Sequence, residues 1–202
     1  MSYSPAHTKH NAGWLSPLKH RVFRSLWSVW LVANICMWIN DVAAAWAMTS
    51  LTTSATLIAL VQTASSLPVL LLGIPSGAMA DIINRKHYFL FAQVWLATNA
   101  TVLMLFSVFD ALNPYLLLLL TFTNGIGLAM RWPIFAAIVP DLVPRDILPS
   151  ALALNAIAMN TSRIVGPLTA GAIIAAAGSM YVFALNMILS LFTVIIVLRW
   201  KY

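Results

Sequence analysis

Residues 55–80 read ATLIALVQTASSLPVLLLGIPSGAMA and contain no charged side chain. A helix that spans the hydrocarbon core of a bilayer needs about 20 mainly apolar residues, and this run is longer than that. Backbone N–H and C=O groups inside a bilayer must bond within a helix or a closed barrel, and the run lacks the alternation of a barrel strand. The stretch therefore predicts a transmembrane helix.

Five further runs of the same character lie on either side of this one. They cover residues 25–48, 88–109, 115–138, 151–177 and 181–198. With 61% hydrophobic and 8% charged residues, the chain does not suit the surface of a water-soluble domain. We predict an all-α, multi-pass membrane protein with six transmembrane helices over residues 25–198, a polar arm over 1–24 and a short end over 199–202. The first run carries Asn40 and Asp41 and is too long for a signal peptide.

Lysine and arginine outside the predicted helices occur only in alternate connections and at the two ends. These basic residues are Lys9, Lys19, Arg21, Arg24, Arg85, Lys86, Arg145, Arg199 and Lys201. The connections around 51–54, 110–114 and 178–180 contain none. Because cytoplasmic loops carry the excess of basic residues, we predict a protein of the cell inner membrane with both termini in the cytoplasm. The net charge of +6 then reflects contact with anionic lipid head groups, and no nucleic-acid partner is expected.

Residue types that hold metals or perform covalent catalysis are scarce in the predicted spans. Cys36 is the single cysteine, and all 4 histidines lie outside the spans without a recognisable ligand spacing. We therefore expect no metal and no cofactor. An intramembrane enzyme would need a nucleophile and a base that face each other, and the spans offer no such pair, so enzymatic activity is not expected. No phosphate-binding G-x-x-x-x-G-K-[ST] loop is present, which favours an ion gradient as the energy source.

Three ionisable side chains lie inside the predicted spans, namely Asp41, Arg131 and Arg163. A charge at the bilayer centre costs roughly 2.5 to 3.5 kcal/mol on the insertion scale, so such residues face the bundle interior or a watery cavity. Asp41 and Arg163 both fall near the middle of the bilayer, and we hypothesise an ion pair between them, with either a transport or a packing role. Asp41 is the only acid in the spans and is the candidate proton carrier. We expect Arg131, near the cytoplasmic end of its span, to snorkel to the head groups rather than line a cavity.

The span at 151–177 carries Gly166, Pro167 and Gly171 in its second half. Small residues let helix backbones approach closely, and proline removes one helical hydrogen bond. We therefore predict a hinge at Gly166, Pro167 and Gly171.

The segment GAMADIINRK, residues 77–86, resembles the signature G-x-L-A-D-R-x-G-R-K of the major facilitator superfamily. The matching positions are Gly77, Asp81, Arg85 and Lys86. Ile82 stands in place of the usual arginine and Asn84 in place of the usual second glycine. Asparagine tolerates a left-handed turn nearly as well as glycine, so the second departure is mild.

Further stretches resemble the branch of that superfamily called transmembrane secretion effectors, which includes the enterobactin exporter. They are Leu67-Pro68, Val139–Arg145, Asn155–Asn160, Arg163–Pro167 and Phe183–Asn186. The resemblance implies the N-terminal half of a twelve-helix transporter, built as a 3+3 inverted repeat. It also implies proton-coupled export of a small, partly hydrophobic molecule such as a siderophore or a drug.

The same resemblance implies roles for individual residues. Asp81 would approach a helix N-terminus in the other half, and Arg85 would pair with Asp141 as part of a gate. The plainer alternative is that Arg85 and Lys86 only follow the positive-inside rule. By family geometry the first and fourth spans line the substrate cavity, and the candidate wall residues are Asn34, Trp38, Asp41, Asn124 and Arg131.

The chain stops where the long central loop of the family would begin, so we expect it to supply one wall of the cavity. Transport would then need a partner, either a separate C-terminal half or a second copy of the chain. The alternatives are a non-transporting membrane scaffold or regulatory subunit, and an inactive truncated remnant.

Overall fold

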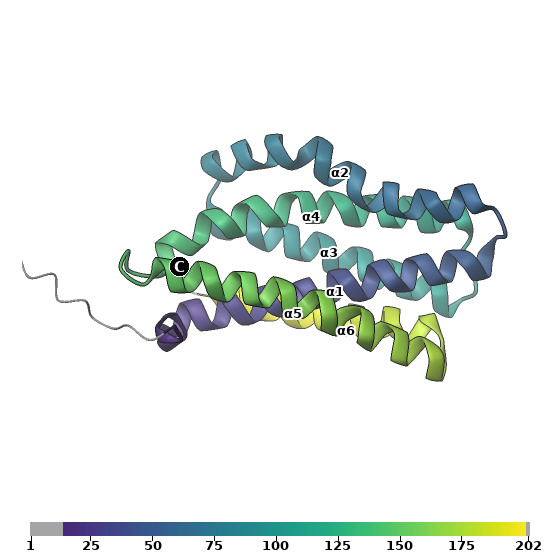
Figure 1. Ribbon diagram of the computed structural model, residues 1–202. Coiled ribbons are helices and arrows are strands. Elements are labelled where there is room, and N and C mark those ends of the chain that lie inside the picture. Colours follow the sequence, from purple (N-terminus) through teal and green to yellow (C-terminus); the bar gives the residue numbers. More distant parts are fainter. Residues whose placement is uncertain (1–13, 201–202) are drawn as a thin grey trace, which may run out of the picture.

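The computed structural model describes residues 14–200. Residues 1–13 and 201–202 lie outside the described part, and with them Lys9 and Lys201 of the orientation argument and most of the predicted arm. The described residues form helices, and no strand occurs among them. The elements are η1 (Ser16–Lys19), α1 (Arg21–Leu51), α2 (Ala55–Ile82), α3 (Arg85–Val108), α4 (Pro114–Leu142), α5 (Leu148–Ala177) and α6 (Ser179–Arg199), arranged as a bundle of long, roughly aligned helices (Figure 1).

Each long helix follows one of the six apolar runs and extends beyond it at one end or at both, although α3 ends at Val108, one residue before the predicted end of its run. Helix α1 begins at Arg21 rather than Ser25, and α4 ends at Leu142 rather than Ile138. Apolar runs mark the part of a helix that suits hydrocarbon, whereas the hydrogen-bonded helix continues into polar residues beyond it. The added turns therefore lie at the polar ends of the runs.

Five of the helices in the described part, α1, α2, α3, α4 and α6, are long and apolar enough to cross a membrane. Helix α5 is not among them. Its first half is the more polar one and contains Asn155, Asn160, Ser162 and Arg163. That α5 is a sixth span stays a prediction.

Asn84 begins α3 as its N-cap. Its side-chain oxygen accepts hydrogen bonds from the backbone N–H groups of Lys86 and His87, at 3.1 and 3.3 Å. These are donors that a helix leaves unsatisfied in its first turn. With φ of −55°, Asn84 is not left-handed, so the explanation of this residue by a left-handed turn is wrong. Ser54 and Asn113 cap α2 and α4 in the same way.

The helices pack in a regular pattern of pairs. The most extensive pairings join α2 with α4 and α1 with α5, followed by α3 with α6, α3 with α4, and α1 with α6. Glycine lies at the two largest of these interfaces. A Cβ atom at Gly125 would lie 2.6 Å from the carbonyl oxygen of Ser65, and one at Gly166 would lie 2.5 Å from Cβ of Trp38. The backbones at both crossings are therefore close enough to need a residue without a side chain.

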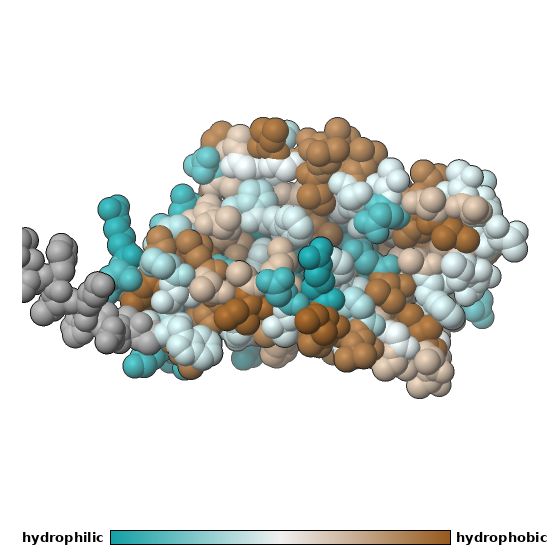
Figure 2. Space-filling model, in the orientation of Figure 1, coloured by the Kyte–Doolittle hydropathy of each residue, from teal (hydrophilic) through white to brown (hydrophobic). Residues whose placement is uncertain are grey.

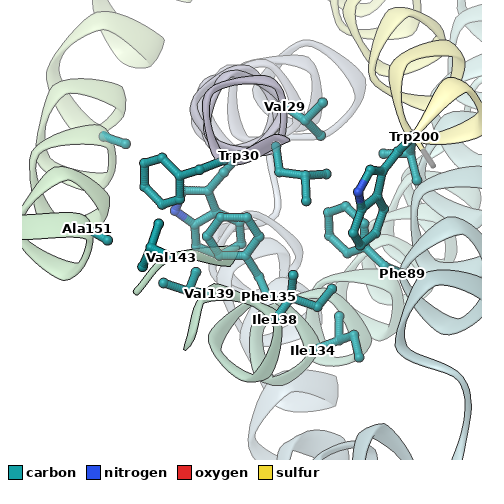
Figure 3. Packing of buried hydrophobic residues seen from close by; sticks show 14 of the residues in the cluster. Val29, Trp30, Phe89, Ile134, Phe135, Ile138, Val139, Val143, Ala151 and Trp200 are labelled. Carbon is teal, nitrogen blue, oxygen red and sulfur yellow. The ribbon is translucent and has the colours of Figure 1, made fainter. Parts of the chain in front are cut away.

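Two apolar clusters fill the two ends of the bundle. One of them contains Trp30, Phe89 and Phe135, and the rings of Trp30 and Phe135 stack with centroids 3.9 Å apart (Figure 3). The other contains Leu117 and Phe183. The polar side chains described below lie between the two clusters, near the middle of the helices.

One end of the bundle carries the basic residues and is called the basic end here. The start of α1, the α2–α3 connection, the α4–α5 connection and the end of α6 lie there, at the left of Figure 1. Its described basic residues are Lys19, Arg21, Arg24, Arg85, Lys86, Arg145 and Arg199. The connections at the opposite end contain no lysine or arginine.

Candidate functional site

Asp41 lies in the middle of α1, on the side that borders α2, and is partly buried. The hydroxyl of Ser65 in α2 donates a hydrogen bond of 3.1 Å to its Oδ1. A carboxylate has about four acceptor positions, so this single bond leaves most of them open. Asp41 can therefore still take a proton or a polar group of a ligand.

Trp38 lies one turn earlier on α1, and Arg163 of α5 covers its ring. The guanidinium carbon of Arg163 is 5.3 Å from the centroid of the Trp38 ring, which is a cation–π contact. Gly166 allows this approach, because a side chain there would meet Cβ of Trp38. We call the surface of α1 that α2 and α5 border, with Trp38, Asp41 and Arg163, the central face. Figure 2 shows hydrophilic side chains over α5 near the middle of the face, next to hydrophobic ones.

The hypothesised ion pair between Asp41 and Arg163 is not formed. Within residues 14–200 the one ion pair is that of Arg85 with Asp141. Asp41 turns to the α2 side of the central face, whereas Arg163 reaches over Trp38 from the α5 side. Arg163 is exposed, and the partner that it contacts is the aromatic face of Trp38.

Arg131 does not reach toward head groups, and the snorkelling expectation is wrong. Its side chain is buried in the bundle, at 2% exposure. One Nη donates to the carbonyl oxygen of Ala33 at 2.9 Å, and the other donates to Oδ1 of Asn34 at 3.4 Å. The guanidinium also lies 5.5 Å from the ring centroid of Trp30. The side chain of Arg131 reaches α1 because residue 131 lies on the packed side of α4.

The five predicted wall residues fall into two separate places, and Asp41 belongs with Trp38 to the central face. Trp38 belongs to the central face, whereas Asn34, Asn124 and Arg131 are buried inside the bundle. Asn124 and Arg131 line an internal cavity of about 20 Å³ between α1, α3, α4 and α6. Asn34 lies beside it, where its side-chain N–H donates to the carbonyl oxygen of Trp30 at 2.7 Å.

Several polar residues of the interior were not singled out in the sequence. Gln93 of α3 is buried at 2% exposure and lines the internal cavity. Asn186 of α6 also lines it and donates a hydrogen bond of 3.2 Å to Asn40 of α1. Ser65 holds Asp41. In the sequence, these residues can be recognised as amide or hydroxyl side chains inside an apolar run. That pattern does not tell which helix each side chain faces.

The motif at the α2–α3 connection brings Arg85 and Asp141 together. Arg85 forms an ion pair and hydrogen bond with Asp141 in the last turn of α4, and it donates to the carbonyl oxygen of Ala137 at 3.0 Å. Asp81 is exposed at the basic end. Gly77 has space around it, since its nearest neighbour would be Cβ of Pro133 at 3.9 Å. Arg85 thus ties the start of α3 to the end of α4, and the gate remains a prediction.

The predicted hinge residues differ in their surroundings. Helix α5 runs without interruption from Leu148 to Ala177 and includes Pro167. Gly166 is packed against α1, whereas a Cβ at Gly171 would meet nothing within 4 Å. Bending at these positions stays a prediction.

Comparison with known proteins places the chain among membrane transporters. The family model of transmembrane secretion effectors, of the major facilitator type, matches residues 12–202. Macrolide efflux protein A of Streptococcus pyogenes is 26% identical over 148 residues, which are 73% of this chain and 36% of that protein. The staphyloferrin A transporter of Staphylococcus aureus is 26% identical over 140 residues, which are 68% of this chain and 35% of that protein. The match thus spans about a third of the length of these curated relatives.

Proposed function

We propose, from the premise that this chain belongs to the transmembrane secretion effector family of major facilitator transporters, that it forms one half of an exporter of small, partly hydrophobic molecules. The observation that carries the proposal is the central face. There the aromatic side chain of Trp38 and the charged side chains of Asp41 and Arg163 lie near the middle of long apolar helices. Polar groups at that depth suit a watery or ligand-filled cavity and do not suit lipid.

The pairing of helices supports a 3+3 repeat. Consider an operation that exchanges α1 with α4, α2 with α5 and α3 with α6. It converts the pairing of α2 with α4 into the pairing of α5 with α1. It also converts the pairing of α3 with α4 into the pairing of α6 with α1. All four are major interfaces. Such an exchange symmetry is expected of an inverted repeat, in which the two triplets have equivalent environments.

A second six-helix half would cover the central face. Exposed apolar side chains lie on the two helices that border it, with Leu70 and Ile74 on α2 and Ile164 and Leu168 on α5. Each pair is spaced by four residues and so forms a stripe along its helix. The relatives are longer than the matched region, which supports a further half that is supplied by more of the chain, by a separate chain or by a second copy.

The relatives suggest the kind of cargo and the direction of transport. One relative is named for macrolide efflux and another for staphyloferrin A transport. The first name indicates efflux, and on that ground we propose export for this chain. We place the basic end in the cytoplasm by the positive-inside rule and the central face at the transport path between the two halves.

Asp41 is the residue that we assign to proton coupling. Among the acids of the described chain it is the one that lies inside a helix away from the helix ends, and its carboxylate keeps open acceptor positions. Protonation would remove a negative charge beside the transport path, and the two charge states would therefore favour different arrangements of the halves.

The experiment reconstitutes the chain with a C-terminal six-helix half in liposomes and measures export of a macrolide and siderophore panel together with proton flux. Asp41→Asn keeps an acceptor for Ser65 but cannot release a proton, so proton flux is expected to fall to the level of empty liposomes. Asp110 is an acid in the α3–α4 connection, and Asp110→Asn is the matched control, which should transport normally.

Unchanged proton flux in Asp41→Asn would remove Asp41 from coupling. Export by the chain alone would show that no separate half is needed, and cargo binding without export would favour a scaffold.

A further inference from the structure

The charge of Arg131 is buried in the bundle without a carboxylate beside it. Its contacts are the carbonyl oxygen of Ala33 at 2.9 Å, Oδ1 of Asn34 at 3.4 Å and the ring of Trp30 at 5.5 Å, and all three are neutral. An arginine side chain stays protonated in proteins. A buried charge is strongly unfavourable unless an opposite charge or several hydrogen bonds compensate it.

None of the acids of the chain is available for that compensation. The sequence has 5 acidic residues, all aspartates and all within the described part, and none of them lines the cavity beside Arg131. Asp41 lies on the α2 side of the central face, away from this cavity, and Asp141 pairs with Arg85. The others, Asp81, Asp110 and Asp146, lie at or beyond the ends of helices. The carboxylates of the described chain therefore do not compensate the charge of Arg131, and an anion from outside it would do so.

The cavity beside Arg131 offers donors and no carboxylate. Its polar lining comes from Asn40 on α1, Gln93 on α3, Asn124 and Arg131 on α4, and Asn186 and Ser190 on α6. Two of these donors are buried without a partner in the described structure, Nε2 of Gln93 and Nε of Arg131, on side chains that are each 2% exposed. Buried N–H groups are nearly always hydrogen-bonded, so two orphans at one cavity indicate a missing acceptor.

The geometry points to a monoatomic anion in this cavity, and we propose that it is chloride in the cell. A volume of about 20 Å³ admits one particle of about the size of water, which suits a monoatomic ion better than sulfate, phosphate or an organic acid. An anion accepts from both orphan donors and also neutralises the guanidinium. A water molecule would accept the same bonds but would leave the buried charge uncompensated.

A bound anion would join four helices at the centre of the bundle. Its donors come from α3 and α4, and the amides of α1 and α6 complete the wall. Binding to the folded form alone raises stability in proportion to the logarithm of ligand concentration above the dissociation constant. Chloride would therefore stabilise this chain whether or not the chain transports anything.

The test measures Tm of the purified full chain in detergent, with sodium chloride, sodium bromide or sodium gluconate at equal ionic strength. A saturable rise in Tm with chloride and bromide, and none with gluconate, is the expected result. Gln93→Met removes one donor at similar size and should abolish the rise. Gln62→Met changes the exposed glutamine of α2 and should preserve it.

The occupant itself is identified by anomalous diffraction from crystals of the unaltered protein grown in bromide. A bromide peak between Gln93 and Arg131 supports the site even where Gln93→Met does not fold. Equal Tm values in chloride and gluconate, a halide-dependent rise that persists in Gln93→Met, or an ordered water without bromide in the cavity would each overturn the proposal.

Discussion

At the scale of the residue, Asn84 performs a task that its position in the family signature does not reveal. The signature has glycine there, and glycine suits turns. In this chain the side-chain oxygen of Asn84 instead binds the N–H groups of Lys86 and His87 and begins α3. The next residue, Arg85, is then held at the start of a helix, from where it reaches Asp141 in α4.

Replacement of this cap tests its role directly. Asn84→Ala should lower the free energy of unfolding by about 0.5 to 2 kcal/mol, the usual cost of losing an N-cap. Asn84→Ser should leave stability nearly unchanged, because serine is also a good N-cap. The measurement is a denaturant titration of the purified chain in detergent. A serine variant as unstable as the alanine variant would contradict the capping role.

The ionisable residues of the spans show which part of a site can be predicted from sequence. Composition alone indicates that Asp41, Arg131 and Arg163 avoid lipid, because that depends only on their charge and depth. Their partners were not predictable. Asp41 bonds Ser65 because α2 borders α1 at that level, and Arg163 covers Trp38 because Gly166 lets the backbones of α5 and α1 approach closely. Such contacts depend on which helices are neighbours, and hydrophobic periodicity carries little information about that.

At the scale of the element, the crossing of α1 and α5 is the interface that holds the central face. The hydroxyl of Ser162 donates to the carbonyl oxygen of Leu31 at 3.3 Å, and the indole N–H of Trp27 donates to that of Leu154 at 3.0 Å. Gly166 lies in the same interface. The position of Trp38, and with it of Arg163, therefore depends on how closely these two helices approach.

An added methyl group at the crossing should separate the helices. Gly166→Ala places a carbon 2.5 Å from Cβ of Trp38, and neither backbone can yield without moving its helix. We expect a loss of about 1 to 3 kcal/mol, the usual cost of overpacking. Gly171→Ala is the control: it meets no neighbour and should be neutral or stabilising by up to about 1 kcal/mol.

Comparison of the two glycine variants by thermal unfolding in detergent tests whether Gly166 is a packing residue. Equal stability of both variants would contradict the close approach. Equal activity in export, combined with lower stability of Gly166→Ala, would assign Gly166 to packing and remove it from the predicted hinge.

At the scale of the whole molecule, the path of α5 decides how many times the chain crosses the bilayer. Five helices are long and apolar enough to cross a membrane, and α5 is not among them. Helix α5 nevertheless runs from the basic end to the opposite end of the bundle. If α5 crosses, the α4–α5 and α5–α6 connections lie on opposite sides of the membrane. The positive-inside rule puts the first of these in the cytoplasm.

Cysteine labelling in whole cells measures this arrangement. In a Cys36→Ser background, Asp110→Cys and Ser179→Cys should react with an impermeant thiol reagent from outside. Asp146→Cys should react only after the cells are opened. Labelling of Asp146→Cys and Ser179→Cys from the same side would show that α5 does not cross.

The polarity of α5 has a consequence for biosynthesis. A segment with Asn155, Asn160, Ser162 and Arg163 partitions into lipid less readily than the helices made before it, since each polar group resists transfer from the translocon. Helix α1 is by then already in the membrane and offers Trp38 and the backbone next to Gly166 as a docking surface. We therefore expect the entry of α5 into the bilayer to be coupled to its folding onto α1. A defect at the crossing of these two helices should then appear first as wrong topology in the newly made chain.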